Sequence, residues 1–232
     1  MLKIDLHIHT KEDPTETISY SAKQLIDKAS ELKFDVIAIT NHGSVAHTKE
    51  LYEYAKKKNI LLIPGAEILI NNKEVLVYNI TNDTKKKIKS FEDLKTLKNS
   101  LVIAPHPFFT FSQCLKGELI KNIECFDGIE YSHFYIKNIN NNKKAVEVAK
   151  KYNIALVGNS DSHSLWQLGT TYSLIDAKKN IQSVFNAIKK NNVIVKTKPL
   201  KIQQFIYIGS RATFHLIKKK IFAKWKKLKQ QS

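Results

Sequence analysis

The feature that most constrains the fold of this chain is the regular alternation of short apolar runs with amphipathic segments. Residues 34–40 (FDVIAIT) and 101–106 (LVIAPH) are continuous apolar runs, a pattern typical of strands that are buried on both faces. Between such runs, apolar residues recur at helical spacing, as in 19–32, where Ser21 is a candidate helix N-cap. About seven strand–helix units in one chain predict a parallel sheet.

The expected elements cover most of the chain. The predicted strands are 2–9, 34–40, 60–68, 74–80, 101–106, 126–133, 154–160 and 192–197. The predicted helices are 19–32, 45–58, 91–98, 143–152 and 177–190. Such a series closes into a barrel or stays open as a doubly wound sheet. The lack of a glycine-rich phosphate loop after any strand argues against the nucleotide-binding open sheets.

Positive charge is concentrated at the C-terminal end. The chain of 232 residues has a net charge of +17, yet residues 196–232 contain 11 basic and no acidic residues. Phe214, Ile217, Ile221, Trp225 and Leu228 recur every three or four residues and predict an amphipathic helix. Three alternatives follow for this helix: it packs on the barrel, it lies on an anionic membrane surface, or it binds nucleic acid through its lysines.

The remaining composition is that of an ordinary globular protein. The two cysteines, Cys114 and Cys125, form no CxxC pair, so neither a disulfide framework nor a cysteine-rich zinc site is expected. There is no leader-like N-terminal pattern and no apolar run of about 18 residues. We therefore expect a cytoplasmic protein, with a membrane-peripheral location through the lysine-rich segment as the alternative.

Potential metal ligands follow the predicted strands. In IDLHIH, alternation along a strand places Asp5, His7 and His9 on one face. Histidines or carboxylates end five further strands: His42, Glu67, His106, His133, and the pair Asp161 and His163. A single such residue is more often a turn or capping residue. Because the carboxyl ends of barrel strands converge on one face, the set predicts a site for zinc, manganese or iron with several ions.

These motifs resemble a known family. DLHIHT, TNH, GAE, PHP and NSDSH, in this order, resemble the polymerase and histidinol phosphatase (PHP) superfamily of metal-dependent phosphoesterases. The resemblance runs from residue 1 to about residue 173 and implies a distorted seven-stranded, TIM-like β/α barrel. Composition places the one expected boundary near Pro199, so we expect this domain over residues 1–198 and a basic amphipathic extension over 199–232. It also implies two or three divalent metal ions and hydrolysis of phosphate esters.

The resemblance assigns ligands to this chain. His7, His9, Glu67 and Asp161 would hold a first ion, and Glu67 would bridge it to a second ion at His106. His42 and His163 would hold a third. A carboxylate after the HxH motif would complete that third site, and Asp13 is the expected residue, with Glu12 and Glu16 as competitors.

Two positions depart from the family pattern. Asn41 stands where the family commonly has an aspartate, which removes a charge near the third ion. A histidine usual between the GxE and HP motifs has no counterpart, because residues 68–105 contain none. At the second ion, either water or a displaced His133 would take the place of this histidine, or the ion would be weakly bound. His133 is otherwise expected either to contact substrate or to lie at the surface.

Asp5 lies deeper in its strand than the two histidines. It is expected either to orient an imidazole next to the metal or to bond to a neighbouring strand. The sequence thus predicts a phosphoesterase in which metal-activated hydroxide attacks a phosphorylated metabolite, a nucleotide or a nucleic acid. The alternatives are a nuclease that holds its strand with the basic segment, and a weakly catalytic metal-binding adaptor for nucleic acid or membrane.

Overall fold

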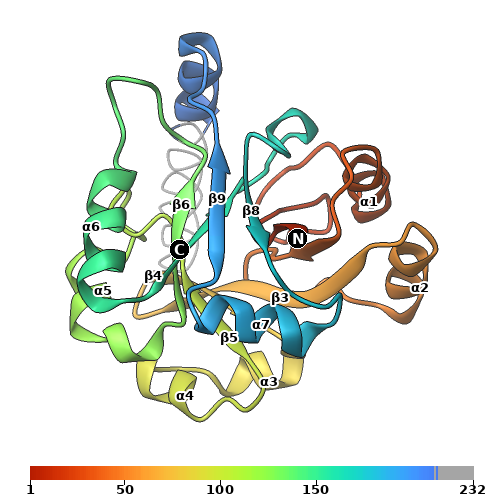
Figure 1. Ribbon diagram of the computed structural model, residues 1–232, viewed down its shortest axis with the longest axis horizontal. Coiled ribbons are helices and arrows are strands. Elements are labelled where there is room, and N and C mark those ends of the chain that lie inside the picture. Colours follow the sequence, from red (N-terminus) through yellow and green to blue (C-terminus); the bar gives the residue numbers. More distant parts are fainter. Residues whose placement is uncertain (212, 214–232) are drawn as a thin grey trace, which may run out of the picture. The chain divides into compact units, whose positions relative to one another are not determined.

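The computed structural model describes residues 1–211 and 213 (Figure 1). Its strands are β1 (Leu2–Asp5), β2 (Val36–Ile39), β3 (Leu61–Ile70), β4 (Lys73–Tyr78), β5 (Leu101–Ala104), β6 (Gly128–Ser132), β7 (Ala155–Asn159), β8 (Thr171–Ile175) and β9 (Val193–Thr197). The helices are α1 (Ala22–Glu31), α2 (Lys49–Lys57), α3 (Asn82–Lys87), α4 (Phe91–Lys95), α5 (Gly117–Lys121), α6 (Asn142–Tyr152) and α7 (Ile181–Lys189). Short 3₁₀ helices span Ile123–Cys125 and Leu165–Gln167.

The strands form one mixed sheet that curls into a nearly closed barrel. Their order is β7-β6-β5-β4-β3-β2-β1-β8-β9 across the described residues. The pairs β1–β2, β2–β3, β5–β6 and β6–β7 are parallel, and the other four are antiparallel. The predicted barrel class is confirmed, but the prediction of seven strands and a parallel sheet is wrong.

The antiparallel pairing of β3 and β4 has a local cause. Asn71 and Asn72 connect these strands, and their φ angles are 49° and 61°. Two successive residues with positive φ form the tight turn of a two-residue hairpin, and asparagine tolerates this conformation better than most residues. The hairpin reverses the chain at once, so β4 runs antiparallel to β3, with Leu69 opposite Glu74.

One strand, β8, was not predicted. β8 carries TYSLI, in which polar and apolar residues alternate, and it pairs with the N-terminal β1. β7 is an edge strand of the sheet, and Ser173 on β8 forms hydrogen bonds to it through its hydroxyl. Gly158 N donates to Ser173 Oγ at 2.8 Å, and the hydroxyl donates back to Gly158 O at 3.1 Å. Side-chain hydrogen bonds therefore join these two strands where no ladder does.

Three apolar clusters surround the sheet. The barrel interior, including Ile4, Ala38 and Val157, packs on Val184 and Phe185 of α7. The second cluster lies between the β1–β3 region and helices α1 and α2, which are on the right in Figure 1. The third lies between β3–β6 and the helices α4 to α6. The predicted N-cap of α1 is confirmed, since Ser21 forms a capping box with Gln24.

The chain divides into two compact units. The first comprises Met1–His133 and Asn141–Lys198, and the second comprises Phe134–Asn140 and the residues from Pro199 onward. Within the second unit, Leu200 N donates to Tyr135 O at 2.9 Å, and the rings of Phe134 and Phe205 stack with centroids 4.4 Å apart. Residues 202–211 are helical. The functional division between residues 198 and 199 stays a prediction.

The predicted apolar stripe from Phe214 to Leu228 lies outside the described residues, as do Trp225 and the lysines around it. Among the residues that are described, no helix has the length and apolar character needed to cross a membrane.

Candidate metal centre

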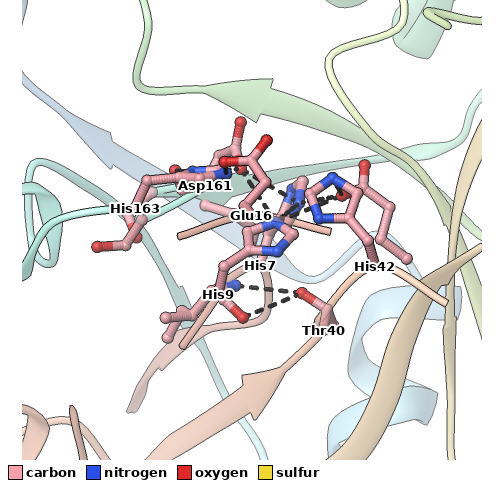
Figure 2. A network of polar contacts seen from close by, with 12 residues as sticks. His7, His9, Glu16, Thr40, His42, Asp161 and His163 are labelled. Carbon is pink, nitrogen blue, oxygen red and sulfur yellow. Dashed lines mark hydrogen bonds and ion pairs between the residues drawn. The ribbon is translucent and has the colours of Figure 1, made fainter. Parts of the chain in front are cut away.

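The HxH segment comes directly after β1 and is held against the end of β2. Ile8 N donates to Thr40 Oγ1 at 3.2 Å, and Thr40 N donates to Ile8 O at 2.8 Å. Ile8 is fully buried on the apolar side. Alternation along the chain therefore directs His7 and His9 to the opposite side. There they meet His42, Asp161 and His163, which come from the ends of two other strands (Figure 2).

Four donor atoms form the tightest group of the site. His7 Nε2 lies 3.1 Å from His9 Nε2, and Glu67 Oε2 lies 3.3 Å from both. Asp161 Oδ1 lies 3.3 Å from His7 Nε2 and 3.4 Å from His9 Nε2. Ligand atoms about 2.1 Å from a tetrahedral ion are roughly 3.4 Å apart. The four atoms therefore have the spacing of a metal ligand set.

Electrostatics at this group are strongly coupled. Burial disfavours a charged His7 imidazole, but Asp161, Glu130 and Glu67 outweigh that effect and raise the pKa of His7 to about 10. Burial likewise opposes charge on Asp161, yet the surrounding histidines, His7 first, lower the pKa of this carboxyl. Protons on the imidazoles thus neutralise the buried carboxylates, which is the role that a cation would take.

Glu130 on β6 contacts the ring nitrogen of His7 that is turned away from the other donors. Its Oε1 lies 2.9 Å from His7 Nδ1 and accepts from Asn159 Nδ2 at 3.0 Å, while its Oε2 accepts from His106 N at 2.8 Å. A carboxylate on the outer nitrogen is the usual partner of a metal-binding imidazole. Sequence reasoning missed Glu130, although a glutamate in the otherwise apolar strand GIEYS was a usable signal.

A second group lies beside the first. Glu67 directs its Oε1 toward His106 Nε2, 3.5 Å away. Glu67 Oε1 is buried and has no hydrogen-bond partner in the described structure. His106 and Asp161 follow β5 and β7, and both have positive φ angles, 26° and 43°. Backbone strain of this kind is characteristic of functional sites.

The residues expected around a third ion separate into two roles. Asp13 Oδ2 contacts the outer nitrogens of His9 and His42, at 3.1 Å and 2.8 Å, and it accepts from His42 N at 2.8 Å. Glu16 Oε2 instead lies 3.2 Å from His163 Nε2. Glu12 accepts from Ala22 N at the start of α1. The structure thus places Glu16, and not Asp13, against His163.

Comparisons with known proteins bear on the family. A family model described as PHP-associated matches residues 140–193. An uncharacterised protein of Methanocaldococcus jannaschii is 27% identical over 181 residues, which are 74% of this chain and 69% of that protein. The PolC-type DNA polymerase III of Thermotoga maritima is 31% identical over 83 residues, which are 35% of this chain and 6% of the polymerase.

Solved structures share the fold. PsfC from Pseudomonas syringae has a TM-score of 0.64 at 15% identity, covering 93% of this chain and 98% of its own. A lesion-specific endonuclease of Pyrococcus furiosus has a TM-score of 0.60 at 13% identity, covering 90% and 66%. A proposed metal-dependent phosphoesterase of Bifidobacterium adolescentis has a TM-score of 0.54 at 15% identity, covering 69% and 87%. The family model and the PolC-type relative confirm the predicted resemblance to the PHP superfamily.

Asp5 and Asn41 each hold a backbone segment next to the site. Asp5 Oδ1 accepts from His7 N at 3.3 Å and from Ser160 N at 3.1 Å, and burial raises the pKa of Asp5 to about 7. This arrangement matches the predicted bond to a neighbouring strand, whereas the contact with an imidazole is made by Glu130. Asn41 holds Thr10, since its Oδ1 accepts from Thr10 N at 2.9 Å and its Nδ2 donates to Thr10 Oγ1 at 3.0 Å.

His133 lies in the protein interior. Its side chain is almost fully buried, so the prediction of a surface residue is wrong. Gln167 Nε2 donates to His133 Nε2 at 3.0 Å, and Gln167 Oε1 accepts from His163 N at 2.9 Å. Burial lowers the pKa of His133 to about 4, which suits an imidazole that accepts this bond. Its contact with substrate stays a prediction.

The geometry of the candidate site fits divalent metal ions. Imidazole nitrogens and carboxylate oxygens converge at ligand spacing, and Glu67 Oε1 is left without a hydrogen bond at the centre. Buried polar atoms in folded proteins nearly always have a partner. A divalent cation between these groups satisfies them.

Proposed function

We propose that this chain is a metal-dependent phosphoesterase that hydrolyses a phosphate ester. The observation that carries the proposal is the set of four converging donors, His7 Nε2, His9 Nε2, Glu67 Oε2 and Asp161 Oδ1, at 3.1–3.4 Å. Zinc, manganese and iron all accept this mixture of imidazole and carboxylate ligands. Similarity to a proposed metal-dependent phosphoesterase supports the same reaction class.

Each group has a stated task. His7, His9, Glu67 and Asp161 hold the first ion, and Glu67 also reaches a second ion at His106. Glu130 fixes His7 so that its Nε2 faces the ion. His163 with Glu16, and His42 with Asp13, flank the site on the side where a third ion would lie. When bound, such ions acidify a water molecule and neutralise charge on the phosphoryl oxygens.

The test is a panel of phosphate monoesters and diesters, assayed with Zn²⁺, Mn²⁺ and Fe²⁺ on the full chain. Wild type should turn over at least one ester, while His7→Ala and Glu67→Ala should lose activity by roughly 10²-fold or more, as expected for loss of a group essential to charge stabilisation. Lys57→Ala, on the exposed end of α2, is the control. Undiminished turnover in both site variants would contradict the proposal.

A nuclease is the second candidate. The PolC-type polymerase and the lesion-specific endonuclease are the relatives that favour nucleic acid as the phosphate ester. Oligonucleotides, single-stranded and duplex, therefore belong in the same panel. If the lysine-rich segment holds the strand, truncation after Lys198 should weaken binding and reduce its salt dependence.

The remaining predictions lie outside these observations. An adaptor with little catalysis would bind metal and turn over no member of the panel. Anionic-membrane binding by the lysine-rich segment, the cytoplasmic location and the identity of the metal stay predictions.

A further inference from the structure

We propose that Glu74 completes a second metal site with Glu67 Oε1 and His106 Nε2, and takes the place of the histidine that this sequence lacks. This inference rests on the proposed metal-dependent function and deepens it. Glu74 Oε2 lies 3.9 Å from His106 Nε2, and Glu67 Oε1 lies 3.5 Å from the same nitrogen. Ligands in a shared coordination sphere have separations in this range.

The sheet register brings Glu74 to this place. The hairpin sets Leu69 opposite Glu74 and Glu67 opposite Leu76, so the two glutamates are diagonal neighbours on one face of β3 and β4. β4 then runs antiparallel to β5, with Leu76 opposite Ile103. The same register carries Glu74 to the point where the chain leaves β5 toward His106. A shift of one residue would turn Glu74 to the other face.

The environment of Glu74 calls for a cation. Its side chain is buried, and His106 is the one basic group within ion-pair distance among the described residues. Glu67 lies beside Glu74 on the same face of the sheet and directs its Oε1 at the same imidazole, so two buried carboxylates face one basic group. Buried charges of one sign are costly unless a counter-ion or metal compensates them.

Cys114 lies on the opposite edge of the His106 ring. Its Sγ is 3.5 Å from His106 Nδ1, and the thiol is buried and free. With Nε2 directed to the ion, Nδ1 carries the proton and donates to sulfur. Cys114 is therefore a positioning residue and not a ligand. The three ligands are then two carboxylates and one imidazole, a set that favours Mn²⁺ or Fe²⁺ over Zn²⁺.

The experiment counts ions. Metal-free full chain is titrated with Mn²⁺, and bound and free ion are separated by electron paramagnetic resonance. Glu74→Gln and Glu74→Ala should bind one equivalent fewer than wild type, or bind that equivalent at least tenfold more weakly. His7→Ala should instead lose the first equivalent. Glu147→Gln on the exposed face of α6 is the matched control and should bind as wild type does.

Two further variants separate the ligands. Glu74→His should keep the ion count and raise the preference for Zn²⁺ over Mn²⁺ in competition. Wild type loaded with Co²⁺ should show no thiolate charge-transfer band, and Cys114→Ser should keep the second equivalent. A thiolate band that Cys114→Ser abolishes would overturn the role given to the sulfur and to Glu74.

The outcomes distinguish this inference from the proposed function. An unchanged ion count and affinity in both Glu74→Gln and Glu74→Ala overturns the inference alone, as does a wild type with no ion at His106. Loss of the second equivalent in a chain that hydrolyses no ester supports Glu74 as a ligand and contradicts the phosphoesterase. If wild type binds no ion at all, both fail. The Co²⁺ spectrum of wild type provides a readout that does not depend on folding of a variant.

Discussion

Glu130 Oε1 lies 2.9 Å from His7 Nδ1, and through Oε2 the same carboxylate accepts from His106 N at 2.8 Å. One buried side chain on β6 therefore orients a ligand of the first proposed ion and fixes the backbone of a ligand of the second. Asn159 donates to the same carboxylate, so its oxygens face donors on every side.

Glu130→Gln should weaken metal binding with little change in fold. An amide in this place must turn its NH₂ toward a donor, either the side of His7 and Asn159 or the backbone of His106. Loss of such a partner typically lowers metal affinity 10–100-fold. Isothermal titration with Mn²⁺ measures the change, with Glu147→Gln as the exposed control. Wild-type affinity in Glu130→Gln would contradict the role assigned to this residue.

Asn41→Asp should add no ion to the site. The side chain bonds to Thr10, whose hydroxyl can turn and donate to a carboxylate, so the new charge stays directed away from the ligands. Asn159→Asp is the matched comparison, because there the amide donates to Glu130 and two carboxylates would face each other. We expect Asn41→Asp to keep the wild-type ion count and Asn159→Asp to lose stability. Metal analysis and thermal unfolding measure both, and an extra equivalent in Asn41→Asp would overturn this account.

Metal binding should strengthen as the pH rises. In the metal-free protein, the neighbouring carboxylates overcome the effect of burial and raise the pKa of His7 from 6.5 to about 10. The raised pKa contributes to the stability of the metal-free fold. This contribution is fully present below pH 6.5 and is lost as the pH rises through the folded-state pKa of His7. Ions must displace that proton. Titration calorimetry in two buffers with different ionisation enthalpies should therefore show proton release.

Removal of metal should lower the melting temperature. An ion present at about 100 times its Kd stabilises the folded state by roughly 2.7 kcal/mol, which corresponds to several degrees for a domain of this size. A chelator should remove this increment from wild type and have little effect on His7→Ala. An equal chelator effect in the two proteins would place the stabilising ion elsewhere.

Gly158→Ala should destabilise the barrel where β7 approaches β8 and β9. A Cβ at Gly158 would lie 2.8 Å from Val195 Cγ1 and 2.9 Å from the backbone oxygen of Tyr172. Overpacking of this kind typically costs about 1–3 kcal/mol. Gly117→Ala, where a Cβ meets nothing within 4 Å, is the control. Equal melting temperatures for the two variants would show that β7 can move away from β8 and β9 without loss of stability, and would contradict this prediction.

The alternation of apolar runs predicted most of the strands and helices correctly, because burial on both faces requires uninterrupted apolar residues. It missed β8, whose alternating TYSLI is typical of an edge or half-exposed strand, and it placed β4 in a parallel sheet. The direction of β4 depends on a two-residue turn at Asn71 and Asn72, which is a local backbone property.

The sequence by itself determined the chemistry of the site, because five ordered motifs restrict which histidines and carboxylates follow the strands. Only the tertiary structure decided which carboxylate meets which imidazole. Composition alone does not show which imidazole is the partner of each carboxylate among Asp13, Glu16, Glu74 and Glu130. Strand register and loop direction decide these partners. Side-chain partners more than a few residues apart are set by packing of the whole barrel, so local pattern carries little information about them.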